Sequence, residues 1–276
     1  MTTTQKSQAF TPIPGLLSQL ELVQALQDEQ GIVQLRLNRP AKRNAANDQM
    51  IAELHTAFVN LPAAARVIVL SGEGEHFCAG LDLSEVKERS VSEGIMHSRN
   101  WHAAFEQIQF GRVPVIAALH GAVVGGGLEL AAAAHIRVAD SSTFFALPEG
   151  QRGIFVGGGG SARLPRLMGV SAMTDMMLTG RVLTAQEGLA LQLCRYLVAP
   201  GEAVGKAIEL ARKVATNAPL SNFSVMQALP RIADMAQPEG LFVESLMSAI
   251  AQGDDAAKQR VRDFLEKRAA KVEKPQ

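Results

Sequence analysis

Two glutamates lie in apolar, glycine-rich segments that suit acid/base chemistry. Glu129 follows the glycines of 125–127 and precedes an alanine run, and Glu149 follows Leu147-Pro148 and precedes the glycines of 157–160. The three-glycine turn lets a backbone amide approach a ligand closely, and the helix expected after it directs its positive end to the same place. Each motif alone is also compatible with tight packing or an ordinary helix start. Together they indicate a site for proton transfer.

The elements that must position these glutamates follow an α/β pattern. The runs at 20–25 and 32–37, with Gly31 between them, predict a hairpin, and Asn47 is a plausible N-cap for an amphipathic helix. Continuous apolar runs predict buried strands at 67–70, 113–119 and 136–139. Beyond residue 173 the sequence predicts almost no strands, apart from one at 196–198. Helices are expected at 202–216, 221–235 and 241–268, the last interrupted at 253–255. We therefore expect a loose leader at 1–18, a core at 19–200 and a helical region at 201–276.

Composition excludes several classes of protein. A chain of 276 residues with 47% hydrophobic residues can bury one large core. Its 27 basic residues are balanced by 27 acidic residues, so the charge indicates no polyanion-binding surface. Aromatic residues make up 5% of the chain, which provides poorly for stacking on bases. The longest apolar region, 113–139, is too interrupted by glycine, proline and charge to span a membrane. We expect no nucleic acid and no membrane as partners.

The cysteines and histidines indicate no metal or redox site. Cys78 and Cys194 have no recognisable spacing, and no secretory signal peptide precedes them, so a reducing cytoplasm is the expected location. His55, His97 and His102 lie on helical patterns without paired acids, and none of the six histidines has the spacing of metal ligands. We expect no metal.

With these elements placed, the chain resembles the enoyl-CoA hydratase/isomerase (crotonase) superfamily over nearly its full length. The motifs that carry the resemblance occur in the family's order: Asn38-Arg39-Pro40 with Arg43-Asn44-Ala45, Phe77–Leu83, His120-Gly121 leading into Gly125–Glu129, Leu147-Pro148-Glu149 with Gly157–Gly160, and Leu178-Thr179-Gly180. The resemblance implies a spiral of ββα units and an acyl-CoA thioester substrate with no resident cofactor. It also implies homotrimers, or dimers of trimers, built through the C-terminal helices.

The resemblance also implies roles for single residues. The amides of Leu81 and Gly126 match the oxyanion hole that polarises the thioester carbonyl, and Glu129 and Glu149 match the two carboxylates that hold the added water. Gly157 matches an amide near that water. The family usually has Ile-Pro before this glycine, whereas this chain has Phe155-Val156, which the resemblance would place at the acyl end of the substrate. The resemblance therefore leaves the acyl group of the substrate open.

The CoA part of the substrate would meet two groups of residues. Basic side chains near the first motif could bind phosphates, with other residues beside the adenine: Arg39, Lys42 and Arg43 with Ala45, then Ala79, Asp82 and Leu83. Phe264 and Lys267 match a C-terminal pair that in the family reaches CoA, often from a neighbouring subunit. An ordinary solvated loop and an amphipathic helix end are the alternative interpretations of these two groups.

Both glutamates are present, so hydration of a 2-enoyl-CoA is favoured, because isomerases of the family generally retain fewer of these carboxylates. A family isomerase or acyl-CoA hydrolase is the alternative. An RNA-binding relative is disfavoured because Lys206, Arg212 and Lys213 are too few to form a phosphate-binding helix face. The segments 147–160 and 230–234 resemble a subgroup that acts on 3-(methylthio)acryloyl-CoA, where hydration is followed by thioester hydrolysis.

Overall fold

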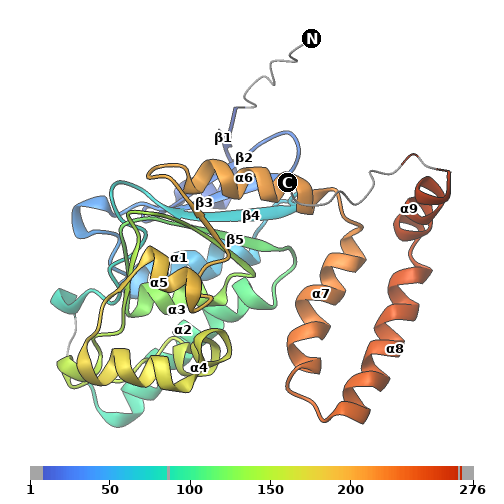
Figure 1. The fold of residues 1–276 in the computed structure, drawn as a ribbon. Helices are drawn as coiled ribbons and strands as arrows, with labels where there is room; N and C mark the ends of the chain where they lie inside the picture. The colour runs from blue at the N-terminus through green and yellow to red at the C-terminus, as the bar shows by residue number, and fades with distance from the viewer. Residues whose placement is uncertain (1–8, 86–87, 267, 269–276) are drawn as a thin grey trace. The chain divides into compact units, whose positions relative to one another are not determined.

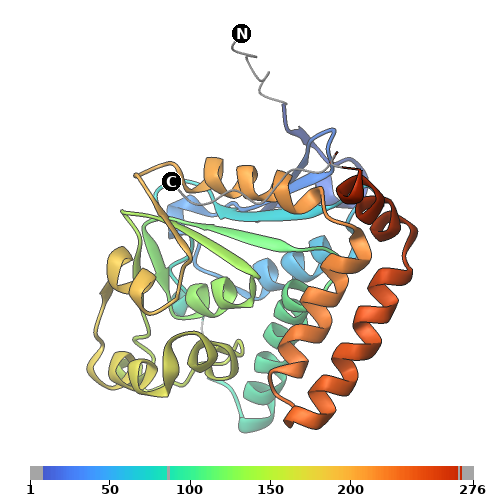
Figure 2. The same cartoon turned by 45° about the vertical axis from the view of Figure 1, so that its right-hand side comes forward.

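The computed structural model describes residues 9–85, 88–266 and 268, which form two compact units. The first unit extends to Ala215 and the second begins at Thr216. Helix α6 (Ala203–Ala215), which the sequence analysis grouped with the helical region, therefore belongs to the first unit. Both units are drawn in Figures 1 and 2 and are described separately below.

A seven-stranded sheet forms the centre of the first unit. Its strands are β1 (Thr11–Pro12), β2 (Val23–Gln27), β3 (Ile32–Leu37), β4 (Val67–Gly72), β5 (Val115–Leu119), β7 (Ile136–Asp140) and β10 (Tyr196–Val198), in the order β1-β2-β3-β4-β5-β7-β10. The β1–β2 and β2–β3 pairs are antiparallel and the others are parallel. The predicted hairpin and the predicted buried strands are confirmed.

Helices cover both faces of this sheet, and alternate strand residues divide between two cores. On β4, Ile68 and Leu70 join the larger core with α1 (Asp48–Val59), α2 (Val91–Gln109) and α3 (Gly126–Ala133). Val67 and Val69 face the smaller core formed with α6. Figure 1 shows α6 on one side of the sheet and α1 and α3 on the other. Because both faces of such a strand are covered, its residues form a continuous apolar run, which is the pattern that predicted the strand.

A smaller sheet positions the two glutamates. It contains β6 (Ala122–Val124), β8 (Phe144–Ala146) and β9 (Leu183–Thr184), in the order β6-β8-β9. Val124 pairs with Ala146 in the parallel β6–β8 ladder, so the segments that follow these strands run side by side. One of them begins α3 and carries Glu129, and the other carries Glu149. The pairing of β6 with β8 therefore brings together two motifs that are separate in the sequence.

The remaining elements of the first unit connect these parts. They are the 3-10 turns η1 (Gly15–Gln19), η2 (Pro40–Lys42), η3 (Leu83–Glu85) and η4 (Gly150–Arg152), with α4 (Gly160–Thr179) and α5 (Ala185–Ala190). Helix α1 begins as predicted, because the Asn47 side chain accepts a hydrogen bond from the Met50 amide. Strand β9 was not predicted. It has only two residues, and Thr184 also caps α5.

The second unit contains three helices, α7 (Pro219–Ile232), α8 (Gln237–Gly253) and α9 (Asp255–Leu265). Helices α7 and α8 pack as a helical hairpin (Figure 1). The predicted interruption near 253–255 is confirmed, since Asp254 ends α8 and caps α9 through the Ala257 amide. Several large apolar side chains of α8 are exposed: Leu241, Phe242, Leu246 and Ile250. In the described part of the chain, all helices are too short or too polar to cross a bilayer.

Candidate active site

Two backbone amides, those of Leu81 and Gly126, come together at the start of α3. A Cβ placed on Gly126 would lie 3.6 Å from the Leu81 nitrogen, and one placed on Gly80 would lie 3.4 Å from the Gly126 nitrogen. In the bridge between Ala46 and Leu81, Ala46 bonds to the residues on either side of Leu81. Gly126 is the first residue of α3, where an amide has no partner within the helix. Among the described residues neither amide donates to the protein, so both are available to a ligand oxygen.

Glu129 is buried in the first turn of α3 and accepts two hydrogen bonds on one oxygen. Its Oε1 lies 2.8 Å from the Gly158 amide nitrogen and 2.7 Å from that of Gly160. Gly160 begins α4, so the positive end of a second helix also faces this carboxylate. Burial is the largest influence and raises the pKa of Glu129, while the glycine amides and Arg163 oppose the increase. The carboxylate is therefore held in one orientation and is more basic than an exposed glutamate.

Glu149 is 6% exposed and differently placed. Its Oε2 is buried and has no hydrogen-bond partner in the described part of the chain. Its Oε1 faces Gly125, where a Cβ would lie only 2.7 Å away. Burial raises the pKa of Glu149 to about 7, the charge of Glu129 adds to the increase, and Arg152 opposes it. An unpaired buried carboxyl oxygen costs free energy unless a ligand or water satisfies it. Glu149 can therefore carry a proton near neutral pH, whereas the two amides that donate to Glu129 favour the ionised form of that carboxylate.

Packing or backbone geometry requires three of the four glycines at 157–160. A Cβ on Gly158 would lie 2.9 Å from the Phe105 ring, and one on Gly160 would lie 2.8 Å from Cγ of Glu129. Gly159, which lies between them, has a φ of 94°, a backbone conformation that favours glycine. This part of the glycine run thus allows two amides to reach the buried carboxylate.

Gly157, the first of the run, is different. A Cβ there would have Ser98 Oγ as its nearest neighbour, at 3.7 Å, which is an ordinary contact. Close packing therefore does not require a glycine at this position, which lies beside the loop that holds Glu129. The two preceding residues, which the resemblance places at the acyl end, differ in exposure. Val156 is 7% exposed and Phe155 is 68% exposed.

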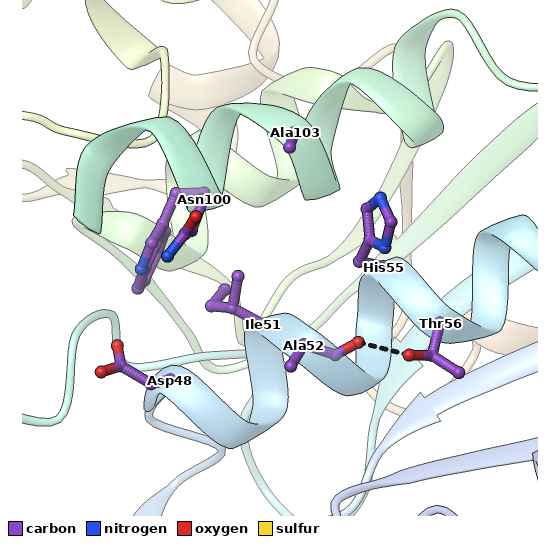
Figure 3. A pocket seen from close by; sticks show the side chains of 8 residues that line it. Asp48, Ile51, Ala52, His55, Thr56, Asn100 and Ala103 are labelled. Carbon is purple, nitrogen blue, oxygen red and sulfur yellow. Dashed lines mark hydrogen bonds between the residues drawn. The ribbon is translucent and has the colours of Figure 1, made fainter. Parts of the chain in front are cut away.

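Trp101 on α2 packs against this site. A Cβ on Gly126 would lie 2.7 Å from Cζ3 of the indole, and one on Gly158 would lie 3.2 Å from Cε3. The same side chain lines a groove of about 380 Å³ between α1 and α2. The groove is lined by residues of both helices: Asp48, Ile51, Ala52, His55 and Thr56 of α1, and Asn100, Trp101 and Ala103 of α2. Figure 3 shows Ile51 and His55 pointing toward α2. Neither glutamate lines this groove, so Trp101 separates it from the candidate site.

One expectation about the histidines is wrong. His97 was expected to lack an acidic partner, but its Nε2 lies 2.9 Å from Oδ1 of Asp48. The pair forms because α1 and α2 pack together, which spacing along the chain does not show. Within residues 9–85, 88–266 and 268, no group of three or more His, Cys, Asp or Glu side chains is arranged to hold a metal ion.

Arg39, one of the cations assigned to CoA, is engaged within the protein. Its Nη1 donates to Asp82 Oδ2 at 2.6 Å and to the Ala45 carbonyl at 3.0 Å. Asp82 is 6% exposed, and the Ser84 hydroxyl together with Arg39 lowers the pKa of this carboxyl to about 2. The Arg39 charge is therefore largely compensated, and this pair ties Asp82, the residue that follows Leu81, to the segment that contains Arg39.

The other residues assigned to CoA are spread over both units. Lys42 ends η2 and Arg43 follows it, and both are exposed. The Arg43 carbonyl accepts a hydrogen bond from the Ala79 amide at 3.0 Å. Leu83 is exposed. Phe264 lies on α9 of the second unit and is 67% exposed, and Lys267 lies outside the described residues. The structure thus brings the cations of the first unit near the Leu81 segment.

Sequence reasoning missed three residues that surround the glutamates. Trp101 and Ser98 lie on α2, and Arg163 on α4 donates to the Gly158 carbonyl at 3.0 Å and to Gln109 at 2.6 Å. The single tryptophan was a usable signal for a special position. Nothing in the spacing of Ser98 or Arg163 relates either of them to the glycine run.

Comparisons with known proteins agree with this geometry. The sequence pattern of the enoyl-CoA hydratase/isomerase family matches residues 27–275. The chain is 32% identical to the short-chain-enoyl-CoA hydratase of Clostridium acetobutylicum over 90% of this chain and 97% of that protein. It is 32% identical to the 2,3-dehydroadipyl-CoA hydratase of Escherichia coli over 87% and 94% of the two chains.

Solved structures are similar as well. A structure from Rhodopseudomonas palustris that carries the name of an enoyl-CoA hydratase superposes with a TM-score of 0.87 and 55% identity, covering 89% of this chain and 95% of the other. An enoyl-CoA hydratase from Bacillus anthracis gives a TM-score of 0.84 at 30% identity, covering 90% and 97%. The expected crotonase-like α/β fold is confirmed. The chain belongs to the enoyl-CoA hydratase/isomerase family.

Proposed function

We propose that this enzyme hydrates short 2-enoyl-CoA thioesters. The observation that carries the proposal is the pair of buried glutamates, Glu129 and Glu149, beside two amides, of Leu81 and Gly126, that donate to no acceptor among the described residues. Two amides orient Glu129, whereas Glu149 has an oxygen with no partner in the described part of the chain and a pKa raised to about 7. This difference suits Glu129 to act as the base and Glu149 to act as the acid at neutral pH.

The reaction follows from these groups. The amides of Leu81 and Gly126 bind the thioester carbonyl oxygen and stabilise the enolate that forms there, and each such donor typically contributes roughly 3 to 4 kcal/mol. Polarisation makes the β-carbon electrophilic. Glu129 takes a proton from water as the water oxygen bonds to the β-carbon, and protonated Glu149 gives its proton to the α-carbon. The C=C bond becomes a single bond, and proton exchange with solvent restores both carboxyl groups.

The same proposal extends to CoA binding, assembly and cellular location. Lys42 and Arg43 meet the CoA phosphates, and the carboxylates and amides supply the chemistry with no resident cofactor. The exposed apolar residues of the second unit support a homotrimer or a dimer of trimers. Two buried, free cysteines, Cys78 and Cys194, support the proposal that the enzyme works in the cytoplasm.

For the acyl group, we propose 3-(methylthio)acryloyl-CoA as a substrate. The resemblance of segments 147–160 and 230–234 to that subgroup supports it, together with the departure at Phe155-Val156. Water added to a carbon that bears sulfur gives a hemithioacetal, which releases methanethiol and leaves an aldehyde at that carbon. A second water then attacks the thioester carbonyl, whose oxyanion the same two amides stabilise, and CoA leaves.

A panel of 2-enoyl-CoA esters tests both levels of the proposal. Loss of the enoyl absorbance measures hydration, and chromatography separates free CoA from methanethiol. We expect simple esters to give 3-hydroxyacyl-CoA with little free CoA, and the methylthio ester to release CoA. Glu129→Gln and Glu149→Gln should each lower hydration by about 100-fold or more. A double bond that moves along the chain without water addition would instead indicate an isomerase. No reaction with any ester would refute the hydratase assignment.

A further inference from the structure

Ser98 on α2 makes a hydrogen bond that the proposed mechanism has not used. Its hydroxyl donates to the Gly157 carbonyl at 2.6 Å, and its oxygen lies 3.4 Å from Nε2 of His102, one turn further along the helix. Both side chains are half-buried. Because the single Ser98 proton points to Gly157, the contact with His102 requires a hydrogen on Nε2 of the imidazole.

The Gly157 carbonyl and the Gly158 amide belong to one peptide group. The amide nitrogen of that group donates to Glu129 Oε1 at 2.8 Å. A peptide group is planar, so fixing its oxygen also fixes the direction of its N–H. Accepting a hydrogen bond at the oxygen polarises the group and strengthens the donor on its other side. Ser98 and Glu129 therefore bind opposite ends of the same peptide.

We propose that Ser98 is a positioning residue for Glu129, acting through the 157–158 peptide, and that His102 orients the Ser98 hydroxyl. The proposal rests on the proposed function, in which Glu129 is the base. The Gly160 amide also donates to Glu129, but it belongs to α4 and is fixed by the helix. The 157–158 peptide precedes α4 and needs another partner to fix it. Arg163 donates to the next carbonyl along the chain, that of Gly158. Ser98 and Arg163 therefore fix two successive peptide groups.

Several charges face the groups involved and bear on any pH measurement. Arg163 and Glu149 act on Glu129. His102 is surrounded by Arg99, Arg163 and Glu106, and burial with the two arginines lowers its pKa. The pKa of His102 therefore lies below the ordinary value of 6.5, and the contact with Ser98 requires a hydrogen on Nε2 in either charge state. None of these charged groups is removed by a substitution at Ser98.

The test compares Ser98→Ala with Ser98→Thr, and with Ser92→Ala as a matched control on the exposed start of the same helix. Without the hydroxyl, the Gly158 amide is a weaker donor, the ionised form of Glu129 loses support and its pKa rises. We expect Ser98→Ala to lower kcat about 10-fold with KM within about twofold, and to move the low-pH limb of kcat to higher pH. Ser98→Thr should restore both, and Ser92→Ala should match the unchanged protein.

A second measurement separates this proposal from the proposed function. Carbon NMR of labelled glutamate carboxyls, with the Glu129 signal assigned from Glu129→Gln, should show a Glu129 pKa about half a unit or more higher in Ser98→Ala. An unchanged Glu129 titration, or a change in KM alone, would overturn the positioning role. If the protein hydrates no enoyl ester but the titration still shifts, the hydratase proposal fails and the Ser98 contact stands.

Discussion

Glu129 and Glu149 are the same side chain in two surroundings, and the difference lies in their hydrogen bonds. Both are buried, and burial raises both pKa values. Two amides of the glycine run donate to Glu129 and stabilise its charge, whereas Glu149 interacts with its own backbone amide and has a buried Oε2 without a partner in the described residues. The sequence indicated two carboxylates in apolar segments. It could not assign their roles, because the amides that distinguish them come from a loop that only the fold brings near.

The raised pKa of Glu149 predicts a stability that falls with pH. Its value is about 7 in the folded protein against 4.5 for an ordinary glutamate, so the folded state binds the proton more tightly. Stability then decreases as pH rises from about 4.5 to 7. Glu149→Gln removes this dependence and should stabilise the protein at pH 8.5, relative to pH 5, by about 1 to 3 kcal/mol. Urea unfolding at the two pH values measures the difference.

Glu187 provides the control for that experiment. Hydrogen bonds from the Thr184 backbone, Arg181 and the Thr184 hydroxyl lower the pKa of Glu187 to about 2. The stability linked to a lowered pKa is fully present above the unfolded value of about 4.5, so it does not change between pH 5 and pH 8.5. Glu187→Gln should therefore change the free energy of unfolding equally at both pH values. An equal effect of Glu149→Gln at both would contradict the raised pKa.

At the scale of elements, short local signals predicted most of the framework. The continuous apolar runs located β4, β5 and β7, and the glycines of 125–127 located the start of α3. Strand β9 was missed because two residues carry no periodicity. The approach of α2 to the glycine run was also missed, because Ser98 and Gly157 are joined by a tertiary hydrogen bond with no trace in local spacing. Side-chain contacts between elements are what the sequence alone does not provide.

The glycine run gives a prediction at this scale, since its members lack side chains for different reasons. A Cβ on Gly160 would press on Glu129 at 2.8 Å, while one on Gly157 would meet only Ser98 Oγ at 3.7 Å. Gly160→Ala should displace the carboxylate, lowering kcat about 100-fold and reducing the melting temperature. Gly157→Ala should leave the melting temperature unchanged and lower activity by crowding the water or substrate. Thermal melts with kinetics distinguish the two. Full activity of Gly157→Ala would show that water and substrate do not lie against this glycine.

At the scale of the whole molecule, the second unit is the part a single chain explains least. Its large apolar side chains are mostly exposed, although burial of such groups is what stabilises helices in a folded protein. The sequence predicted the helices, but local patterns do not show which surface covers their apolar side chains. Assembly through this unit stays a prediction that the next experiment tests.

Phe242, Leu246 and Ile250 recur every four residues and form one exposed apolar stripe on α8, and Ser248 lies on another side of the helix. A charge buried in an interface is costly, so Leu246→Glu should shift sedimentation from a trimer or larger assembly to smaller species. It should also raise KM for CoA esters if Phe264 and Lys267 reach the CoA of a neighbouring subunit. Ser248→Glu, which adds the same charge, should change neither property. An assembly unaffected by Leu246→Glu would show that this stripe is not the interface, and a dissociated protein with unchanged KM would show that each chain binds CoA alone.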